Sequence, residues 1–384
     1  MTSGKSIICF SANDWSDIAS SKLHIMKYLG KSNTVLYIDT IGIRRPRLNS
    51  RDGKRALGKL QRILRGIRRV ESNVFVWSPF AIPYHGVLGV DWFNARFIAM
   101  MVKRFASKLG MRQPIIWSYL PNAIDIIKRI PATRVIYHCI DDYGAFTDVP
   151  KSVFEKMERR MLKQADLTVV SAKRLFELRK PYAKRIVHIP HGVNLAEFQD
   201  ELRKDVYLPD IDSLRRPIAG FVGRIADWVD LPLIVGCAKA LPDWTFVLVG
   251  PSNIDLSPYL NIPNMVFLGK KNHEEIPYYI RRFNVCLMPF IKHPLVDSIN
   301  PLKMYEYLAV GKPVVSVPLV EIEEYSHLIT ITSPSNFPTA IQIAYREDTE
   351  EKQQQRIDSV SRRSWGDIAE TILGMVDITN NPSL

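Results

Sequence analysis

Residues 300–315 read NPLKMYEYLAVGKPVV, and this stretch indicates the fold more directly than any other part of the chain. Asn300 suits the N-cap of a helix, and Pro301 suits its first turn because the amide hydrogen that proline lacks would be unpaired there. Gly311 then supplies a left-handed stop, and residues 314–317 read as a short apolar strand. A helix that runs directly into such a strand is one unit of an α/β fold.

The start of this helix has the chemistry of a nucleotide site. The bare backbone amides of a helix N-terminus bind phosphate. Lys303 in the first turn can add a positive charge, and Glu306, three residues on, shares its face and could accept two hydrogen bonds from a ribose diol. A surface helix with an internal Lys–Glu pair would show the same residues, so other parts of the chain have to distinguish the two.

Short apolar strands alternate with helical stretches throughout the 384 residues, which predicts parallel sheets covered by helices. The pattern runs once through the first half and starts again after a junction at residues 190–217. We therefore expect two doubly wound domains facing a cleft, residues 1–190 with a final helix at 365–384, and residues 191–364. The expected strands are residues 7–10, 35–38, 74–77, 115–117, 135–139, 167–170 and 186–189, then 218–222, 245–249, 265–268, 285–288, 314–317 and 328–332.

The charge is divided unevenly between the two halves. Residues 1–190 hold 34 Lys and Arg against 14 Asp and Glu, whereas the remaining 194 residues hold 18 against 25. The first half should therefore meet something anionic. Residues 44–69 carry eleven cations and one acid, with apolar residues at helical spacing, which suits a basic amphipathic helix on an anionic membrane. A solvated or disordered loop is the alternative.

The four cysteines stand singly within apolar runs and form no CxxC or Cys/His cluster, so we expect buried thiols, no disulfide frame and no metal site. The first residues turn polar too early for a secretory signal, and no apolar run approaches the roughly 20 residues of a membrane span. We expect a cytoplasmic protein that associates peripherally with the inner face of the membrane.

Five motifs in order resemble the GT-B nucleotide-sugar glycosyltransferases, specifically the large bacterial group that contains family 4. These are HGVNLAEF at 191–198, GFVGRIADW at 220–228, LPDWTFVLVGP at 241–251, NPLKMYEYLAVGKPVV at 300–315 and SWGDIAETIL at 364–373. The resemblance covers nearly the whole chain. It implies a nucleotide-diphosphate sugar donor, and it implies that the last helix crosses back onto the first domain.

The resemblance also implies donor-binding roles. Glu306 matches the acid that holds the ribose, and Lys303 matches the cation on the diphosphate, with Leu302 and the helix start supplying backbone contacts. Gly223 and Arg224 match the turn beside the phosphates. Gly250 and Pro251 match a segment near the base. The site would further include Ser298, which stands where the family usually has a second Glu, and Asn300.

Catalytic candidates come from both halves. The segment VIYHCIDDY is similar to xanthan-type glucuronosyltransferases, in which an Asp is the catalytic base, and Asp141 matches it. Asp142 is adjacent, and because successive residues point apart, we expect only one of the two to face substrate. A helix-capping pair would look the same. His191 lies near the donor diphosphate in the family, although a hinge-packing histidine is an alternative. Asn13 and Lys22 could line the acceptor side.

We expect metal-independent transfer from a UDP-sugar, without a cofactor, because Lys303, Arg224 and the helix amides could stabilise the leaving diphosphate. A lipid-linked saccharide acceptor on a polyprenyl diphosphate would explain the basic first half, and it points to surface polysaccharide assembly in bacteria. Two alternatives remain. The first is a basic nucleic-acid-binding protein. This sequence lacks the stacking aromatic motifs of such proteins, so we expect no nucleic acid partner. A sugar-nucleotide epimerase or hydrolase could share the same frame.

Overall fold

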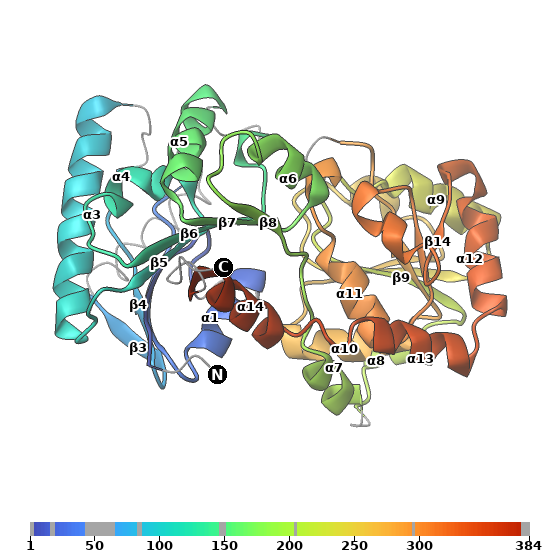
Figure 1. Ribbon diagram of the computed structural model, residues 1–384. Coiled ribbons are helices and arrows are strands. Elements are labelled where there is room, and N and C mark those ends of the chain that lie inside the picture. The colour runs from blue at the N-terminus through green and yellow to red at the C-terminus, as the bar shows by residue number, and fades with distance from the viewer. Residues whose placement is uncertain are drawn as a thin grey trace. The chain divides into compact units, whose positions relative to one another are not determined.

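The computed structural model describes residues 4–15, 20–42, 66–82, 87–145, 151–202, 206–293 and 296–377. Contacts within the chain divide it into two compact units: unit 1 is Met1–Pro190 with Trp365–Leu384, and unit 2 is His191–Ser364. Each unit has its own sheet and its own hydrophobic core (Figure 1). The predicted pair of doubly wound α/β domains is therefore confirmed.

The sheet of unit 1 contains eight described strands in the order β3-β4-β2-β1-β5-β6-β7-β8. Neighbouring strands are parallel except for the edge pair β3 and β4. Strands such as β5, with the sequence IIWS, are buried along their whole length, as expected when helices cover both faces of a parallel sheet. The strands are β1 (Ser6–Phe10), β2 (Thr34–Ile38), β3 (Arg68–Glu71), β4 (Val74–Trp77), β5 (Ile115–Ser118), β6 (Arg134–Cys139), β7 (Leu167–Val170) and β8 (Ile186–His188).

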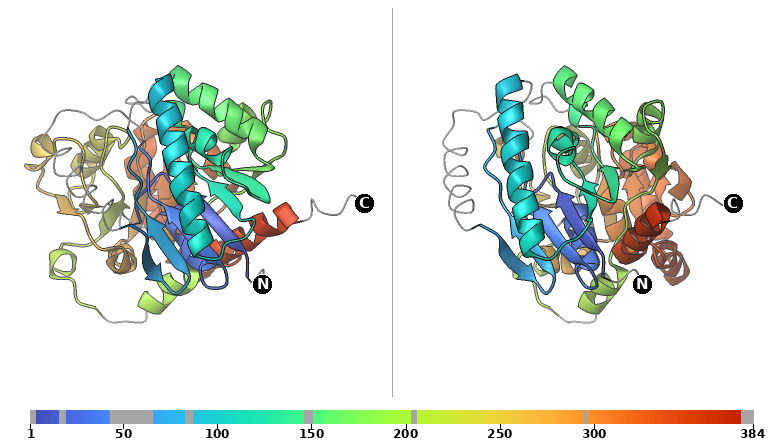
Figure 2. Two further views of the ribbon diagram at one scale, coloured as in Figure 1. Left: turned by 90° about the vertical axis from the view of Figure 1, so that its left-hand side faces the viewer. Right: turned by 60° about the vertical axis from the view of Figure 1, so that its left-hand side comes forward.

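Helices pack on this sheet, and α3 runs along the outside of the unit (Figure 2). The C-terminal helix α14 (Trp365–Asp377) returns to unit 1 and packs on α1, which confirms the predicted crossing. The His24 ring stacks on the Trp365 ring with centroids 5.5 Å apart. A Cβ atom at Gly366 would lie 2.5 Å from the Tyr28 ring, so a larger residue there would displace that ring. The other helices are α1 (Ser21–Leu29), α3 (Leu88–Lys108), α4 (Ile124–Ile127), α5 (Lys151–Gln164) and α6 (Lys173–Arg179).

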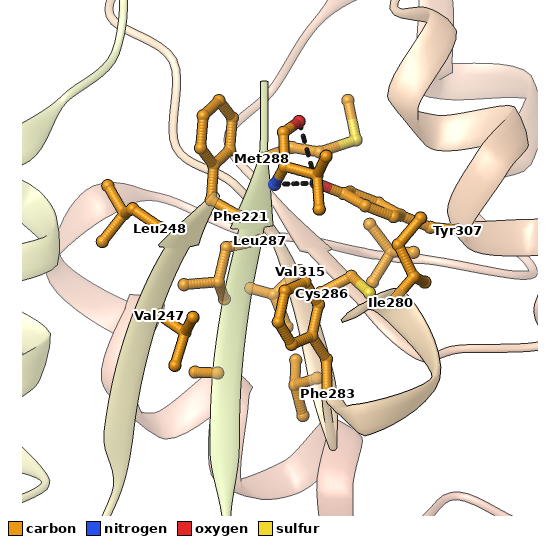
Figure 3. Close-up of a cluster of buried hydrophobic side chains, with 14 of the residues drawn as sticks. Phe221, Val247, Leu248, Ile280, Phe283, Cys286, Leu287, Met288, Tyr307 and Val315 are labelled. Atoms are coloured by element: carbon orange, nitrogen blue, oxygen red, sulfur yellow. Dashed lines mark hydrogen bonds between the residues drawn. The ribbon is translucent and has the colours of Figure 1, made fainter. Parts of the chain in front are cut away.

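The sheet of unit 2 contains six described strands, all parallel, in the order β11-β10-β9-β12-β13-β14. Its core is closely packed around the central strand. Figure 3 shows the Phe283 ring within this core, and a Cβ atom at Gly220 of β9 would lie 2.3 Å from that ring. The strands are β9 (Ile218–Val222), β10 (Thr245–Val249), β11 (Met265–Gly269), β12 (Val285–Met288), β13 (Val314–Ser316) and β14 (Thr330–Ile331).

The helices of unit 2 are α7 (Leu195–Leu202), α8 (Pro209–Asp212), α9 (Leu231–Ala240), α10 (Ile276–Arg282), α11 (Leu302–Ala309), α12 (Phe337–Arg346) and α13 (Glu350–Ser359). Three of them, α9, α10 and α11, lie between strands of the sheet in chain order, whereas the other four precede β9 or follow β14.

The basic segment differs from its prediction where the structure describes it. Residues 43–65 lie outside the described residues, and so does most of the predicted membrane-binding stretch 44–69. Its last two residues, Arg68 and Arg69, belong to the edge strand β3 and pair antiparallel with β4. The prediction that the helix extends to residue 69 is therefore wrong. Charged side chains are common on edge strands, where they discourage pairing with other chains.

The four cysteine thiols are buried and unpaired, as predicted. Burial raises the pKa of the Cys237 thiol to about 12, so this thiol is protonated at neutral pH. Across the described ranges, the helices are too short or too polar to span a bilayer.

Candidate functional site

Turns after neighbouring strands of unit 2 lie at one edge of its sheet. Gly223 and Arg224 follow β9, and Gly250 and Pro251 follow β10, its neighbour. Because the strands are parallel, both turns lie at the carboxyl edge, where open α/β sheets bind ligands. The structure thus brings together two of the predicted donor-binding turns.

The two glycines of these turns touch each other. The Gly223 amide donates a hydrogen bond to the Val249 carbonyl oxygen at 2.9 Å. Gly250 has a φ of +146°, and a Cβ atom there would lie only 1.8 Å from the Gly223 carbonyl oxygen. Glycine at position 250 is therefore required by both its backbone conformation and the close approach of the neighbouring turn. The result is a backbone surface at the strand ends that carries no side chain at positions 223 and 250.

Arg224 places a cation beside this surface. Its side chain is exposed, and one guanidinium nitrogen, Nη1, donates a hydrogen bond to Asn253 Oδ1 at 3.1 Å. The next residue, Ile225, donates its amide hydrogen to the Pro251 carbonyl oxygen at 3.0 Å, which holds the two turns together. Arg224 thus projects from a braced turn rather than from a loose loop.

Helix α11 carries the predicted cation and acid as an ion pair. Lys303 Nζ lies 2.6 Å from Glu306 Oε2. The Glu306 side chain is only 4% exposed, whereas that of Lys303 is 26% exposed. The part of the chain that the structure describes donates no hydrogen bond to the other carboxylate oxygen, Oε1. A buried carboxylate with an open oxygen can accept hydrogen bonds from a ligand.

The N-terminus of α11 is open, but it is built differently from its prediction. The helix begins at Leu302, Pro301 occupies the N-cap position, and no side chain caps the helix there. The prediction that Asn300 is the cap is therefore wrong. Within the described residues, the backbone amides of Leu302 and Lys303 have no hydrogen-bond acceptor. These amides are available to an anion.

Asn300 instead links the helix start to the beginning of unit 2. Its Oδ1 accepts a hydrogen bond from the His191 amide at 3.0 Å, and its Nδ2 lies 3.5 Å from Glu321 Oε2. Asn300 and Glu321 are both buried, as is Ser298 just before them. The hydrogen bond to Asn300 places His191, which is half-buried, beside the residues that lead into α11. Ser298 is fully buried, so it supports the loop from within.

Tyr307 connects α11 to the strand end that carries Gly223. The buried Tyr307 Oη accepts a hydrogen bond from the Val222 amide at 2.8 Å (Figure 3). Burial raises the pKa of this hydroxyl, which keeps it protonated. Tyr307 is not among the site residues predicted from the sequence. The signal that could have indicated a role is that a buried tyrosine hydroxyl usually has a polar partner.

Asp141 lies at the carboxyl edge of the unit 1 sheet, just after β6. Its Oδ2 is 3.6 Å from Lys22 Nζ, and Lys22 Nζ donates a hydrogen bond to Asn13 Oδ1 at 2.9 Å. The Lys22 side chain is nearly buried, whereas the Asp141 side chain is 29% exposed. The structure thus joins three predicted residues into a polar cluster with a solvent-accessible carboxylate.

Asp142 has different surroundings from its neighbour. Its Oδ1 lies 2.8 Å from Arg179 Nη2, and Arg179 also contacts Glu158 Oε2 at 3.1 Å. The Arg179 side chain is buried, so Asp142 balances a charge inside the protein. The side chains of Asp141 and Asp142 therefore have separate partners, and Asp141 is the more accessible of the two.

The comparisons with known proteins agree with this geometry. Residues 216–346 match the family described as "Glycosyl transferases group 1". This part of the chain is similar to the group 1 glycosyltransferases. The matched region contains both glycine turns and helix α11. The resemblance drawn from the sequence motifs is confirmed.

A curated relative has a similar sequence. TuaH of Bacillus subtilis (strain 168), named as a candidate teichuronic acid biosynthesis glycosyltransferase, is 28% identical over 205 residues. The match covers 48% of this chain and 51% of TuaH, so the chain spans about half the length of this curated relative.

Solved structures show the GT-B fold over nearly the whole chain. A sucrose-phosphate synthase from Thermosynechococcus elongatus aligns with a TM-score of 0.69 at 16% identity, over 99% of this chain and 100% of that chain. An E. coli trehalose-6-phosphate structure bound with UDP-2-fluoro glucose aligns with a TM-score of 0.68 at 14% identity, over 96% and 98%. Anabaena HepE in complex with UDP-glucose gives a TM-score of 0.61 at 15% identity, over 96% and 99%. At these identities the likeness establishes the fold.

Proposed function

We propose that this protein transfers a sugar from a UDP-linked donor to a lipid-linked saccharide acceptor, without a metal ion, in the assembly of a bacterial surface polysaccharide. The observation that carries the proposal is the Lys303–Glu306 pair at the open start of α11, beside the Gly223 and Gly250 turns. The group 1 family match supports the transfer chemistry. The name of TuaH, which refers to teichuronic acid biosynthesis, supports a role in surface polysaccharide assembly.

In the proposed donor complex, the ribose hydroxyls donate hydrogen bonds to the Glu306 carboxylate. Lys303 would turn from Glu306 toward the diphosphate, where its charge and the amides of α11 oppose the two phosphate charges. Arg224 would approach the same diphosphate from the β9 turn. Because Gly223 and Gly250 have no side chains, the nucleotide could lie against the backbone at the strand ends.

The transfer step needs a base on the acceptor side, and we assign this role to Asp141. The acceptor hydroxyl passes its proton to the Asp141 carboxylate while its oxygen forms a bond to the anomeric carbon of the donor sugar. The bond between that carbon and the diphosphate oxygen breaks, and UDP leaves with the electron pair. Lys22 would hold the carboxylate in place through their 3.6 Å contact.

The leaving diphosphate gains charge as the bond breaks, and fixed positive groups stabilise it. Lys303, Arg224 and the α11 amides supply such groups. For this reason we propose that no divalent cation is needed. His191 would lie close to the same diphosphate, since its amide is tied to Asn300 at the α11 approach.

The lipid-linked acceptor and the peripheral membrane location follow from charge. The first 190 residues carry a net charge of +20, by the counts of 34 cations and 14 acids, and a polyprenyl diphosphate carrier is anionic, as is the bacterial membrane. The basic residues 44–69 would add attraction to the headgroups.

One assay tests the activity. The full-length protein is incubated with UDP-sugars, and UDP release is measured with and without a lipid-linked acceptor. We expect release that depends on the acceptor and persists in excess chelator. Release without acceptor would indicate a hydrolase, and interconversion of the donor sugar without UDP release would indicate an epimerase. Loss of release in chelator that Mg²⁺ restores would contradict metal-independent transfer.

A further inference from the structure

Helix α3 exposes an unusual set of side chains to solvent. Trp92 is 57% exposed, Phe93 is 41% exposed and Met100 is 53% exposed, although large apolar side chains are normally covered. Phe80 and Val87, close to the start of the helix in sequence, are also exposed, at 44% and 48%. The helix lies on the outside of unit 1 and is the cyan helix in the foreground of Figure 2, left.

The exposed side chains of α3 occupy one continuous face. At about 100° per residue, Trp92, Arg96, Met100, Lys103 and Arg104 fall within roughly a third of the helix circumference. The opposite side packs in the hydrophobic core through Ala95, Ile98, Ala99, Val102, Phe105 and Ala106. The outward face therefore combines large apolar groups with cations. We call this set of exposed residues, Trp92, Phe93, Arg96, Met100, Lys103 and Arg104, the α3 face.

The charges on this face have one sign. Arg96, Lys103 and Arg104 are exposed, and α3 has Asp91 as its one acid, which is half-buried and lies on the opposite side from Met100. Each of the two exposed aromatic side chains has a neighbour on the same helix. The Phe93 ring stacks on the Phe97 ring with centroids 5.9 Å apart, and the Arg96 guanidinium lies 5.6 Å from the centroid of the Trp92 ring.

The aromatic end of α3 lies toward the carboxyl edge of the unit 1 sheet. Asn94 Oδ1 accepts a hydrogen bond from the Ile82 amide at 3.0 Å, and Asn94 Nδ2 donates one to the Ile82 carbonyl oxygen at 2.8 Å. Ile82 belongs to the segment that follows β4, so the first turns of α3 are tied to the carboxyl side of that strand. Asp141 follows β6, which runs parallel in the same sheet. The aromatic groups and the candidate base therefore share one edge of unit 1.

We propose that the α3 face is a docking surface for an anionic lipid bilayer. Trp92 and Phe93 would enter the boundary between headgroups and acyl chains, where aromatic side chains are favoured. Arg96, Lys103 and Arg104 would contact lipid phosphates. The α3 face combines apolar and cationic side chains and has no exposed acid. This composition suits an anionic bilayer better than it suits the surface of another protein. This inference rests on the proposed function, in which the acceptor is linked to a lipid. Docking through the α3 face would hold the edge of unit 1 that carries Asp141 toward the membrane.

The test is vesicle binding by the full-length protein, measured as flotation with phosphatidylcholine vesicles that contain or lack phosphatidylglycerol. The double variant W92A/F93A should lower the partition coefficient by about tenfold or more, because two buried aromatic groups are lost. The triple variant R96Q/K103Q/R104Q should lower binding to anionic vesicles by about a hundredfold. Brominated lipids should quench the fluorescence of the wild type more strongly than that of W92F.

Matched controls lie on unit 2. Y207A/L260A removes two exposed apolar side chains, and K239Q/K270Q/R346Q removes the same charge as the α3 triple variant; both should bind vesicles as the wild type does. Equal binding by the α3 variants and the wild type would overturn the proposal, as would a dimer in solution that W92A/F93A dissociates. The UDP affinity of the two α3 variants should equal that of the wild type. This measurement tests the donor site independently of membrane docking.

Discussion

Replacing Gly250 with alanine tests the contact between the two turns of the donor site. The new Cβ atom would lie 1.8 Å from the Gly223 carbonyl oxygen, whereas real Cβ atoms essentially never come closer than 3.0 Å, so the turns must separate by at least about 1.2 Å. The residue would also keep a φ of +146°, which costs an L-residue about 1–3 kcal/mol. Loss of the hydrogen bond from the Gly223 amide to Val249 adds about 1 kcal/mol.

We therefore expect G250A to lower the free energy of unfolding by about 2–4 kcal/mol, which is a fall in Tm of roughly 5–15 °C for a unit of this size. UDP affinity, measured by calorimetry below the unfolding temperature, should fall about tenfold or more because Arg224 moves with its turn. Gly236 on α9 is the matched control, since a Cβ atom there meets nothing within 4 Å. G236A should stabilise the protein by about 0.4–1 kcal/mol. A G250A protein with unchanged Tm and unchanged UDP affinity would refute the reasoning.

Three further substitutions test the link between α11 and β9 and the two adjacent aspartates. Y307F leaves the buried Val222 amide without its acceptor, so urea unfolding should show a loss of about 1–3 kcal/mol and UDP affinity should fall; an unchanged midpoint would contradict the link. D141N should abolish sugar transfer while UDP affinity stays unchanged, and undiminished turnover would remove Asp141 as the base. D142N should instead lower the free energy of unfolding by about 1.5–3 kcal/mol, because buried Arg179 loses a charged partner; a fully stable D142N protein would count against that role.

The sequence predicted well those features that depend on local order. The strands of both sheets are short apolar runs because parallel strands are buried on both faces, and this composition is visible without a structure. The Lys303–Glu306 pair follows from a spacing of three residues on a helix. Strand β3 was not predicted, since an edge strand that reads RRVE has neither the apolar alternation nor the burial that identifies a strand.

Contacts between distant residues could not be predicted in the same way. Asn300 has the side chain of an N-cap, but its Oδ1 accepts a hydrogen bond from His191, 109 residues away, and the cap position falls to Pro301. The hydrogen bond between Tyr307 and Val222 spans 85 residues. Asp141 and Asp142 are equivalent in sequence, and only the fold gives one of them Lys22 and the other Arg179. These partners depend on how strands and helices meet, which one sequence does not specify.

The central claim is that Glu306 holds the ribose of the donor nucleotide, and calorimetric titration of two ligands tests it most directly. E306Q should bind UDP about 10–100-fold more weakly than the wild type, because hydrogen bonds to a charged acceptor contribute about 1.5–3 kcal/mol. The same substitution should change the affinity for 2′,3′-dideoxy-UDP far less, since that ligand has no ribose diol to donate. E350Q, at an exposed acid on α13, is the control and should bind both ligands as the wild type does. Unchanged UDP binding by E306Q, or an equal loss for both ligands, would contradict the account.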